Sequence, residues 1–149
     1  MAQVEKTVLV PFSAEQMFGL VDAVESYPHF LPWCGGVDLQ HRTEASTSAT
    51  LHINYHGLKQ NFTTTNSKQP HTRMDIALVD GPFQSLHGHW QFSALSKTAC
   101  KVEFRLNYEF ANSMLEKIIA PVFSHIADTF VDGFVVRAEG IYGTSHDTY

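Results

Sequence analysis

Nine histidines are the first residues in this chain whose chemistry could serve a function. His52 and His56 fall on one face of a predicted strand, and so do His87 and His89, because side chains alternate across a strand. Either pair could offer two imidazoles to a metal ion such as zinc, which takes four ligands in structural sites. The sequence supplies no third and fourth ligand at a suitable spacing, and no His-Glu-x-x-His. We therefore predict no metal site.

A second group, His125, Asp128, Thr129 and Asp132, recurs at helical spacing near the C-terminal end. These residues could form a catalytic His–Asp pair that faces a pocket, or the water-facing side of an amphipathic helix. The apolar residues between them already provide a face for packing, which favours solvent. No Gly-x-Ser-x-Gly, Gly-x-Gly-x-x-Gly or phosphate-binding loop occurs. We predict no catalytic residue and no enzymatic activity.

The composition narrows the class of protein further. A chain of 149 residues with 44% hydrophobic and 17% charged residues fits one folded domain, which we place at residues 1–143 with a flexible tail at 144–149. The net charge is −5, and the ten Lys and Arg residues are scattered, so no stripe for nucleic acid forms and no DNA partner is expected.

The expected location is the cytoplasm. Cys34 and Cys100 make no disulfide framework, residues 1–6 show no signal-peptide pattern, and no apolar run reaches the ~18 residues of a transmembrane segment. Transient contact with a membrane surface stays compatible with these features.

The secondary structure that must position the candidate side chains begins with a predicted strand over residues 3–10. Ser13 and Gln16 form a capping box that predicts a helix, and a short helical piece is expected at residues 23–30. The Pro- and Gly-containing residues 31–36 then predict a loop.

Residues 37–110 change to a period of two. The clearest alternation runs over residues 102–110, and weaker alternation covers 49–55, 74–78 and 86–92. Turn signals separate these runs at His56-Gly57, Gln69-Pro70 and Asp80-Gly81-Pro82. Short connections imply an antiparallel meander of five or six strands.

The C-terminal part returns to helical spacing. Ser113 to Glu116 reads as a second capping box, and Pro121 is expected to kink the helix that follows. Its apolar stripe is Leu115, Ile119, Val122, Ile126, Phe130, Phe134 and Ala138. About 27 residues would span roughly 40 Å, enough to cross the sheet. The predicted class is α+β, a helix-grip fold in which a curved antiparallel sheet wraps around one long C-terminal helix, with two short helices after the first strand.

Several stretches stand out in this order: Leu9 to Met17, Tyr27 to Cys34, Phe62 to Asn66, Asp80 to Phe83, Gly88 to Phe92, Val122 to Ala138 and Tyr142-Gly143. Together they resemble the coenzyme Q-binding family of START-like proteins, whose bacterial branch is the RatA-type ribosome association toxins. The resemblance covers essentially the whole chain. It implies a helix-grip fold with a ligand tunnel under the C-terminal helix. It also implies two roles, binding of an isoprenoid quinone such as ubiquinone and binding of the large ribosomal subunit. The cyclase/dehydrase label of more distant relatives implies little chemistry here.

Aromatic residues are the main candidates for a binding site. On the residues alone, aromatic side chains on inner strand faces are more often ordinary core than pocket lining. The resemblance to a tunnel-forming family favours a cavity. The predicted ligand-binding residues are Trp33, Tyr55, Phe62, Thr64, Phe83, Trp90, Phe92, Phe104, Tyr108, Phe123 and Phe130.

Trp33 and Phe83 lie in the two most recognisable loops, where a large apolar side chain is either a buried plug or the rim of an opening. We predict partly exposed rim residues that gate the tunnel. Thr64, Asn66 and Asn54 are candidate donors to a quinone head group.

Three functions follow as hypotheses. The first is non-catalytic binding of an isoprenoid quinone, most simply ubiquinone, in support of respiration, with no other cofactor required. The second is a ribosome association toxin-like protein that binds the large ribosomal subunit and blocks subunit joining. The third, which no catalytic motif supports, is an aromatic polyketide cyclase or dehydrase.

Overall fold

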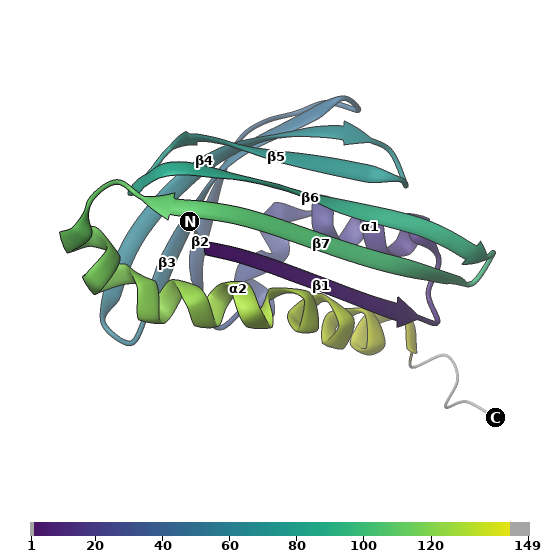
Figure 1. The fold of residues 1–149 in the computed structure, drawn as a ribbon. Coiled ribbons are helices and arrows are strands. Elements are labelled where there is room, and N and C mark those ends of the chain that lie inside the picture. Colours follow the sequence, from purple (N-terminus) through teal and green to yellow (C-terminus); the bar gives the residue numbers. More distant parts are fainter. Residues whose placement is uncertain (1, 144–149) are drawn as a thin grey trace.

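The computed structural model describes residues 2–143 as one curved sheet wrapped around a long helix (Figure 1). The predicted tail at 144–149 lies outside the described residues. The elements in chain order are β1 (Ala2–Val10), α1 (Ala14–Asp22), the 3₁₀ helix η1 (Val24–His29), β2 (Cys34–Arg42), β3 (Ser46–Tyr55), β4 (Leu58–Gln69), β5 (Arg73–Asp80), β6 (Phe83–Ser96), β7 (Ala99–Phe110) and α2 (Ser113–Tyr142). The α+β helix-grip class is confirmed.

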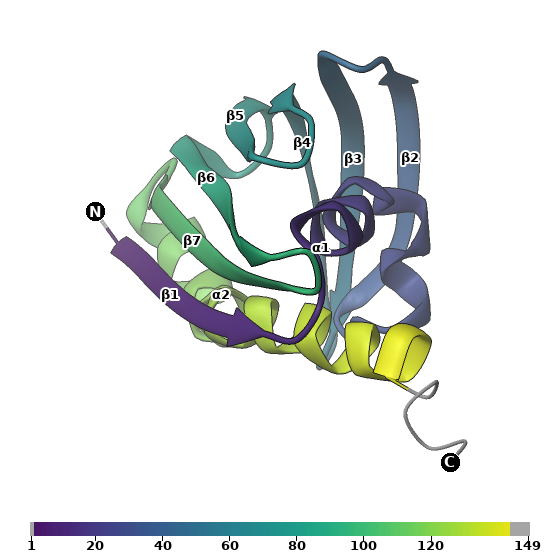
Figure 2. The same cartoon turned by 90° about the vertical axis from the view of Figure 1, so that its right-hand side faces the viewer.

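The sheet has seven antiparallel strands in the order β1-β7-β6-β5-β4-β3-β2. Strands β2 to β7 are the predicted meander, and β1 extends it beyond β7. Register shifts interrupt the ladders near Gly36, Thr64 and Ser85, and such bulges increase local bending and twist. In the view of Figure 2 the sheet curls so that α2 crosses its open side.

The alternation in β7 explains which face is buried. Val102, Phe104, Leu106, Tyr108 and Phe110 are buried, while the intervening charged residues are exposed or half-buried. The same period places Thr47, Ala49, Leu51 and Ile53 of β3 on the concave face. These faces pack against α2, whose buried side chains are Ile119, Phe123, Ile126, Ala127, Val131, Phe134 and Ala138.

The capping predictions have opposite outcomes. Ser13 caps α1 as predicted, with its side chain accepting from Gln16 N and the Gln16 side chain accepting from Ser13 N. For α2 the predicted cap is wrong by one residue. The extended residue is Asn112, whose Oδ1 accepts from Leu115 N, and Ser113 is already helical. Asn and Ser are both strong caps, so their adjacency hides the true start.

Two further details differ from the sequence prediction. The segment 31–36 is not all loop, because β2 begins at Cys34 and pairs there with Ile53. Helix α2 contains Pro121, as predicted, but at 30 residues it is longer than expected. By length and composition alone α2 could also cross a membrane, with a mean hydropathy of 1.4 over its most apolar window. Its packing across the sheet accounts for the same composition, since a core helix is apolar on its inner side.

Candidate functional site

A cavity of about 70 Å³ lies between the concave face of the sheet and α2. Every strand from β3 to β7 contributes to its wall, with α2 and η1 completing it. The lining is almost entirely apolar: Val24, Tyr27, Trp33, Ala49, Leu51, Phe62, Thr64, Asn66, Ile76, Leu86, Trp90, Phe104, Leu106, Phe123, Ile126, Ala127 and Phe130. Such a lining suits an apolar ligand.

Seven of the eleven predicted ligand-binding residues line this cavity: Trp33, Phe62, Thr64, Trp90, Phe104, Phe123 and Phe130. The rings at its centre are in contact. The Trp90 centroid is 4.6 Å from that of Phe104 and 5.6 Å from that of Phe130. These residues come from β6, β7 and α2, so the cavity exists only in the folded chain.

The other four predicted residues, Tyr55, Phe83, Phe92 and Tyr108, do not line this cavity. Phe83 and Tyr108 pack beside the cavity against Phe123, with ring centroids 5.0 and 4.8 Å away. Burial raises the pKa of Tyr108. Phe92 packs edge-on against Phe18 of α1 at 5.6 Å. A residue on the inner face of the sheet belongs to the core. Whether it also lines the cavity depends on its position along the strand.

Tyr55 lies at the end of β3, half-buried, with its ring stacked on His125 of α2 at 5.8 Å. This contact closes the space between the sheet and α2 at that point. His125, Asp128 and Asp132 are exposed and Thr129 is half-buried, as expected of a solvent-facing stripe. Within residues 2–143 no hydrogen bond or ion pair joins His125 to either aspartate; the Thr129 hydroxyl donates to the His125 carbonyl at 2.8 Å.

The predicted exposure of Trp33 and Phe83 is wrong. Their exposed fractions are 3% and 5%. Trp33 is held because it precedes β2 directly and its carbonyl accepts from Asn54 N at 2.9 Å. Phe83 begins β6 and stacks on Phe110 at 5.2 Å. Both loops tuck their aromatic ring inward.

Trp33 also lines a second hollow, here called the outer groove, on the other side of its ring. The outer groove is an open depression of about 620 Å³ between residues 30–33 and the C-terminal half of α2. It is lined by Phe30, Leu31, Pro32, Trp33, His125, Thr129, Asp132, Gly133, Val136, Arg137, Gly140 and Ile141. Gly133 permits the close approach, because a Cβ there would lie 2.6 Å from Leu31 Cδ2. Trp33 thus separates the interior cavity from the surface.

The three predicted head-group donors have different surroundings. The Thr64 hydroxyl donates to Asn66 Oδ1 at 3.1 Å, and Asn66 Nδ2 donates to Met74 Sδ at 3.6 Å, a weak acceptor. Both residues line the cavity. Asn54 is exposed and does not.

Among the described residues, three buried side-chain polar atoms have no hydrogen-bond partner: Trp33 Nε1, Ser85 Oγ and Arg137 Nε. Sequence reasoning singled out Trp33 for its ring and missed Arg137. Of the described residues that line the cavity, only Tyr27 is titratable. Its hydroxyl donates to the Val21 carbonyl, and burial raises its pKa well above the ordinary value.

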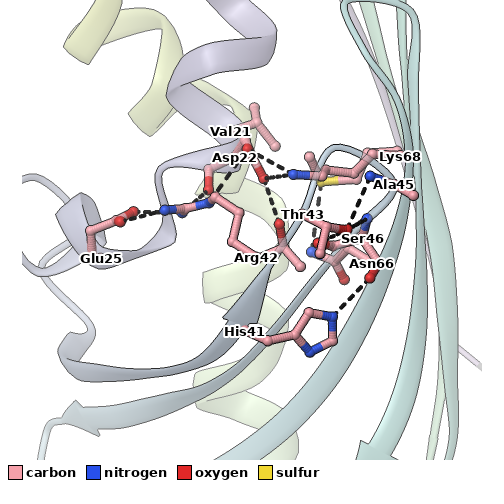
Figure 3. A network of polar contacts seen from close by, with 12 residues as sticks. Val21, Asp22, Glu25, His41, Arg42, Thr43, Ala45, Ser46, Asn66 and Lys68 are labelled. Atoms are coloured by element: carbon pink, nitrogen blue, oxygen red, sulfur yellow. Dashed lines mark hydrogen bonds and ion pairs between the residues drawn. The ribbon is translucent and has the colours of Figure 1, made fainter.

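A polar cluster lies next to the cavity along the same strands (Figure 3). Lys68 Nζ of β4 contacts both carboxylate oxygens of Asp22, at 3.1 and 3.0 Å, and the Lys68 side chain is only 4% exposed. Thr47 donates to Asp22 at 2.9 Å, and Arg42 bridges Asp22 O and Glu25. The cluster fastens the end of α1 and the start of η1 to β2, β3 and β4.

The histidine pairs do not assemble a metal site. His52 Nε2 contacts Asp38 at 2.7 Å on the exposed side of β2 and β3, and His87 is exposed. Within residues 2–143 no group of three or more His, Cys, Asp or Glu side chains could hold a metal ion.

Residues 10–135 match the family described as "Polyketide cyclase / dehydrase and lipid transport". The chain belongs to this family. The chain is 42% identical to the ribosome association toxin RatA of Vibrio cholerae over 143 residues, which are 96% of this chain and 99% of RatA.

Two other similarities are more distant. The chain is 27% identical to the mitochondrial coenzyme Q-binding protein COQ10 homolog B of Xenopus laevis over 136 residues, covering 89% of this chain and 56% of that protein. The structure of the ZhuI aromatase/cyclase from Streptomyces sp. R1128 superimposes with a TM-score of 0.80 at 14% identity, covering 93% of each chain. At that identity the likeness shows the fold alone. The proteins similar to this chain thus include one named for ribosome association and one named for coenzyme Q binding, and an aromatase/cyclase has the same fold.

Proposed function

We propose that this protein binds an isoprenoid quinone such as ubiquinone, with its apolar part in the interior cavity, and catalyses no reaction on it. The observation that carries the proposal is the apolar cavity beneath α2. The family relative named as a coenzyme Q-binding protein supports the same ligand class. The absence of chemistry is proposed because the only titratable group in the described wall is Tyr27, whose hydroxyl is already bound to a backbone carbonyl.

The cavity size sets what can be inside. A water-sized group needs about 10–15 Å³, so 70 Å³ holds about five to seven such groups, close to one five-carbon isoprene unit. Burying one unit contributes about 3–4 kcal/mol before entropic costs. One unit therefore contributes to binding without a charged anchor, and the rest of the affinity must come from contacts outside the cavity.

The test is direct binding of ubiquinone with one isoprene unit to the purified protein. Equilibrium dialysis and quenching of Trp33 and Trp90 fluorescence measure the binding. Ala127→Leu, which adds bulk to the cavity wall, should weaken binding at least tenfold. Ser124→Leu places a leucine side chain on the exposed side of α2 instead and should leave binding unchanged. If the protein shows no saturable binding and organic extracts of it contain no lipid, the proposal is wrong.

We propose, as a second function, association with the large ribosomal subunit. The observation that favours it is the 42% identity to a ribosome association toxin over nearly the whole of both chains. The net charge of −5 argues for contact with a ribosomal protein rather than with RNA phosphates.

Sedimentation with purified subunits tests this function. We expect co-migration with the large subunit that changes little between low and physiological salt. A steep loss with salt would assign the contact to phosphates instead. If no co-migration occurs at any salt concentration, the ribosomal function is wrong, and quinone binding is unaffected.

A cytoplasmic protein that carries a quinone must collect it at a membrane surface. Met114 and Ile118, which are 71% and 55% exposed at the start of α2, support such a transient contact. Flotation with phospholipid vesicles would detect it, and Met114→Ser with Ile118→Ser should abolish it.

A further inference from the structure

The interior cavity is too small for a whole quinone. A substituted quinone ring and one isoprene unit together contain more than twice the heavy atoms that about 70 Å³ accommodates. Ligand pockets ordinarily measure about 300–1,000 Å³. A quinone bound at this cavity must therefore extend beyond it.

The outer groove is the adjacent space. Trp33 lines both the cavity and the outer groove, so its ring is the wall between them. On the groove side the apolar residues Phe30, Leu31 and Pro32, together with α2, line a volume of about 620 Å³. A ligand that passes Trp33 would occupy one continuous site with an interior part and a surface part.

Two buried donors without partners belong to the residues that line this groove. One is Trp33 Nε1–H, and only 3% of the Trp33 surface is exposed. Arg137 Nε–H is the other, and its guanidinium carbon lies 5.1 Å from the Phe30 ring centroid. A buried donor left unpaired costs about 1–3 kcal/mol, so a ligand oxygen that pairs with it regains that free energy.

We propose that the outer groove holds the quinone head group, whose carbonyl oxygens accept hydrogen bonds from Trp33 Nε1–H and Arg137 Nε–H, while the isoprenoid tail enters the interior cavity past Trp33. This proposal rests on the proposed quinone binding. A quinone carbonyl only accepts hydrogen bonds, and both unpaired groups only donate. Arg137 and Trp33 are thus specificity-determining residues for the head group.

The experiment compares two ligands on matched variants. The ligands are ubiquinone with one isoprene unit and the corresponding prenyl-substituted dimethoxytoluene, which has the same tail and no carbonyl. Trp33→Phe keeps an aromatic ring and removes the donor, and Arg137→Met keeps the stem and removes the guanidinium. Each should weaken quinone binding about fivefold, the effect of one hydrogen bond, and leave analogue binding unchanged. Arg105→Met, on the exposed side of β7, is the control and should change neither.

Equilibrium dialysis reads out binding without relying on fluorescence, and far-UV circular dichroism checks that each variant is folded. Two independent variants keep the test decisive if one of them does not fold. If both variants bind quinone as tightly as the unmodified protein, while Asn66→Leu in the cavity wall binds it more weakly, the head group lies inside and the proposal is overturned. An equal loss for quinone and analogue overturns the donor role. If the unmodified protein binds no quinone, the proposed function itself falls.

Discussion

Two regions on the concave face of β3 and β4 have opposite chemistry. At one end Leu51 and Phe62 line the cavity among aromatic rings. At the other end Thr47 and Lys68 hold Asp22 through hydrogen bonds and an ion pair. Along β4 the same face runs from Phe62 through Thr64 and Asn66 to Lys68, from apolar to charged within seven residues.

The difference teaches where this fold can adapt. Apolar contacts are non-directional, so side chains around the cavity can repack around a ligand at modest cost. The contacts of Asp22 are directional and two of them involve a buried ammonium group, so moving them leaves charges unpaired. We infer that the polar cluster fixes α1 and η1 while the cavity region accommodates a ligand.

The largest expected effect lies in the apolar region. Phe104→Ala, Trp33→Ala and Phe83→Ala should each lower the free energy of unfolding by about 3–5 kcal/mol, because all three rings are buried. Denaturant midpoints at constant m-value measure the loss. Leu95→Ala, at a residue 59% exposed, is the control and should change stability by less than about 0.5 kcal/mol. A loss below about 1 kcal/mol for Trp33→Ala would contradict the inference that its buried ring stabilises the fold.

A smaller effect is expected in the polar cluster. Lys68→Met removes the buried partner of Asp22 and should cost about 2 kcal/mol, less than for a fully isolated pair because Thr47 still donates to that carboxylate. Lys59→Met on the exposed side of the same strand is the matched control. If the two variants are equally stable in thermal unfolding, the cluster does not fix α1 as inferred.

The smallest effect concerns pH. The hydrogen bonds from Arg42 hold the pKa of Glu25 below its ordinary value of 4.5. A carboxyl group whose pKa is lowered by folding stabilises the protein above its unfolded pKa, and this contribution disappears as pH falls through the folded pKa. Glu25→Gln should therefore be less stable than the unmodified protein at neutral pH, and the difference should shrink as pH falls below 4.5 and vanish once pH is below the folded pKa. Urea midpoints across this range test it; a difference that grows on acidification would contradict the assignment.

The sequence predicted the elements better than it predicted the site. The alternation of apolar and polar residues over 102–110 is visible in the sequence because one face of β7 is buried and the other faces solvent. The eleven site residues were predicted from the strand face on which each one lies and from a family resemblance. The strand face alone does not distinguish a core residue from one that lines a cavity. Phe92 and Trp90 show this: they are two residues apart on one face, yet only Trp90 reaches the cavity, because α1 covers Phe92.

The remaining features depend on contacts between distant residues. Asp22 and Lys68 are 46 positions apart, and no local pattern marks them as partners. Arg137 resembles any charged residue on an amphipathic helix until the Phe30–Trp33 segment is placed against it. Leu51, Leu86 and Leu106 could have been found, since all three lie on the alternating faces recognised in the sequence.

The pairing of β1 with β7 has a consequence for synthesis of the protein. Ala2 pairs with Tyr108 and Val10 with Cys100, so the strand translated first has no partner until β7 has been made. Contacts so distant in sequence form slowly, and unpaired strand edges invite association with other chains. The β1 strand is therefore made well before β7 and stays unpaired in the sheet until β7 has been translated.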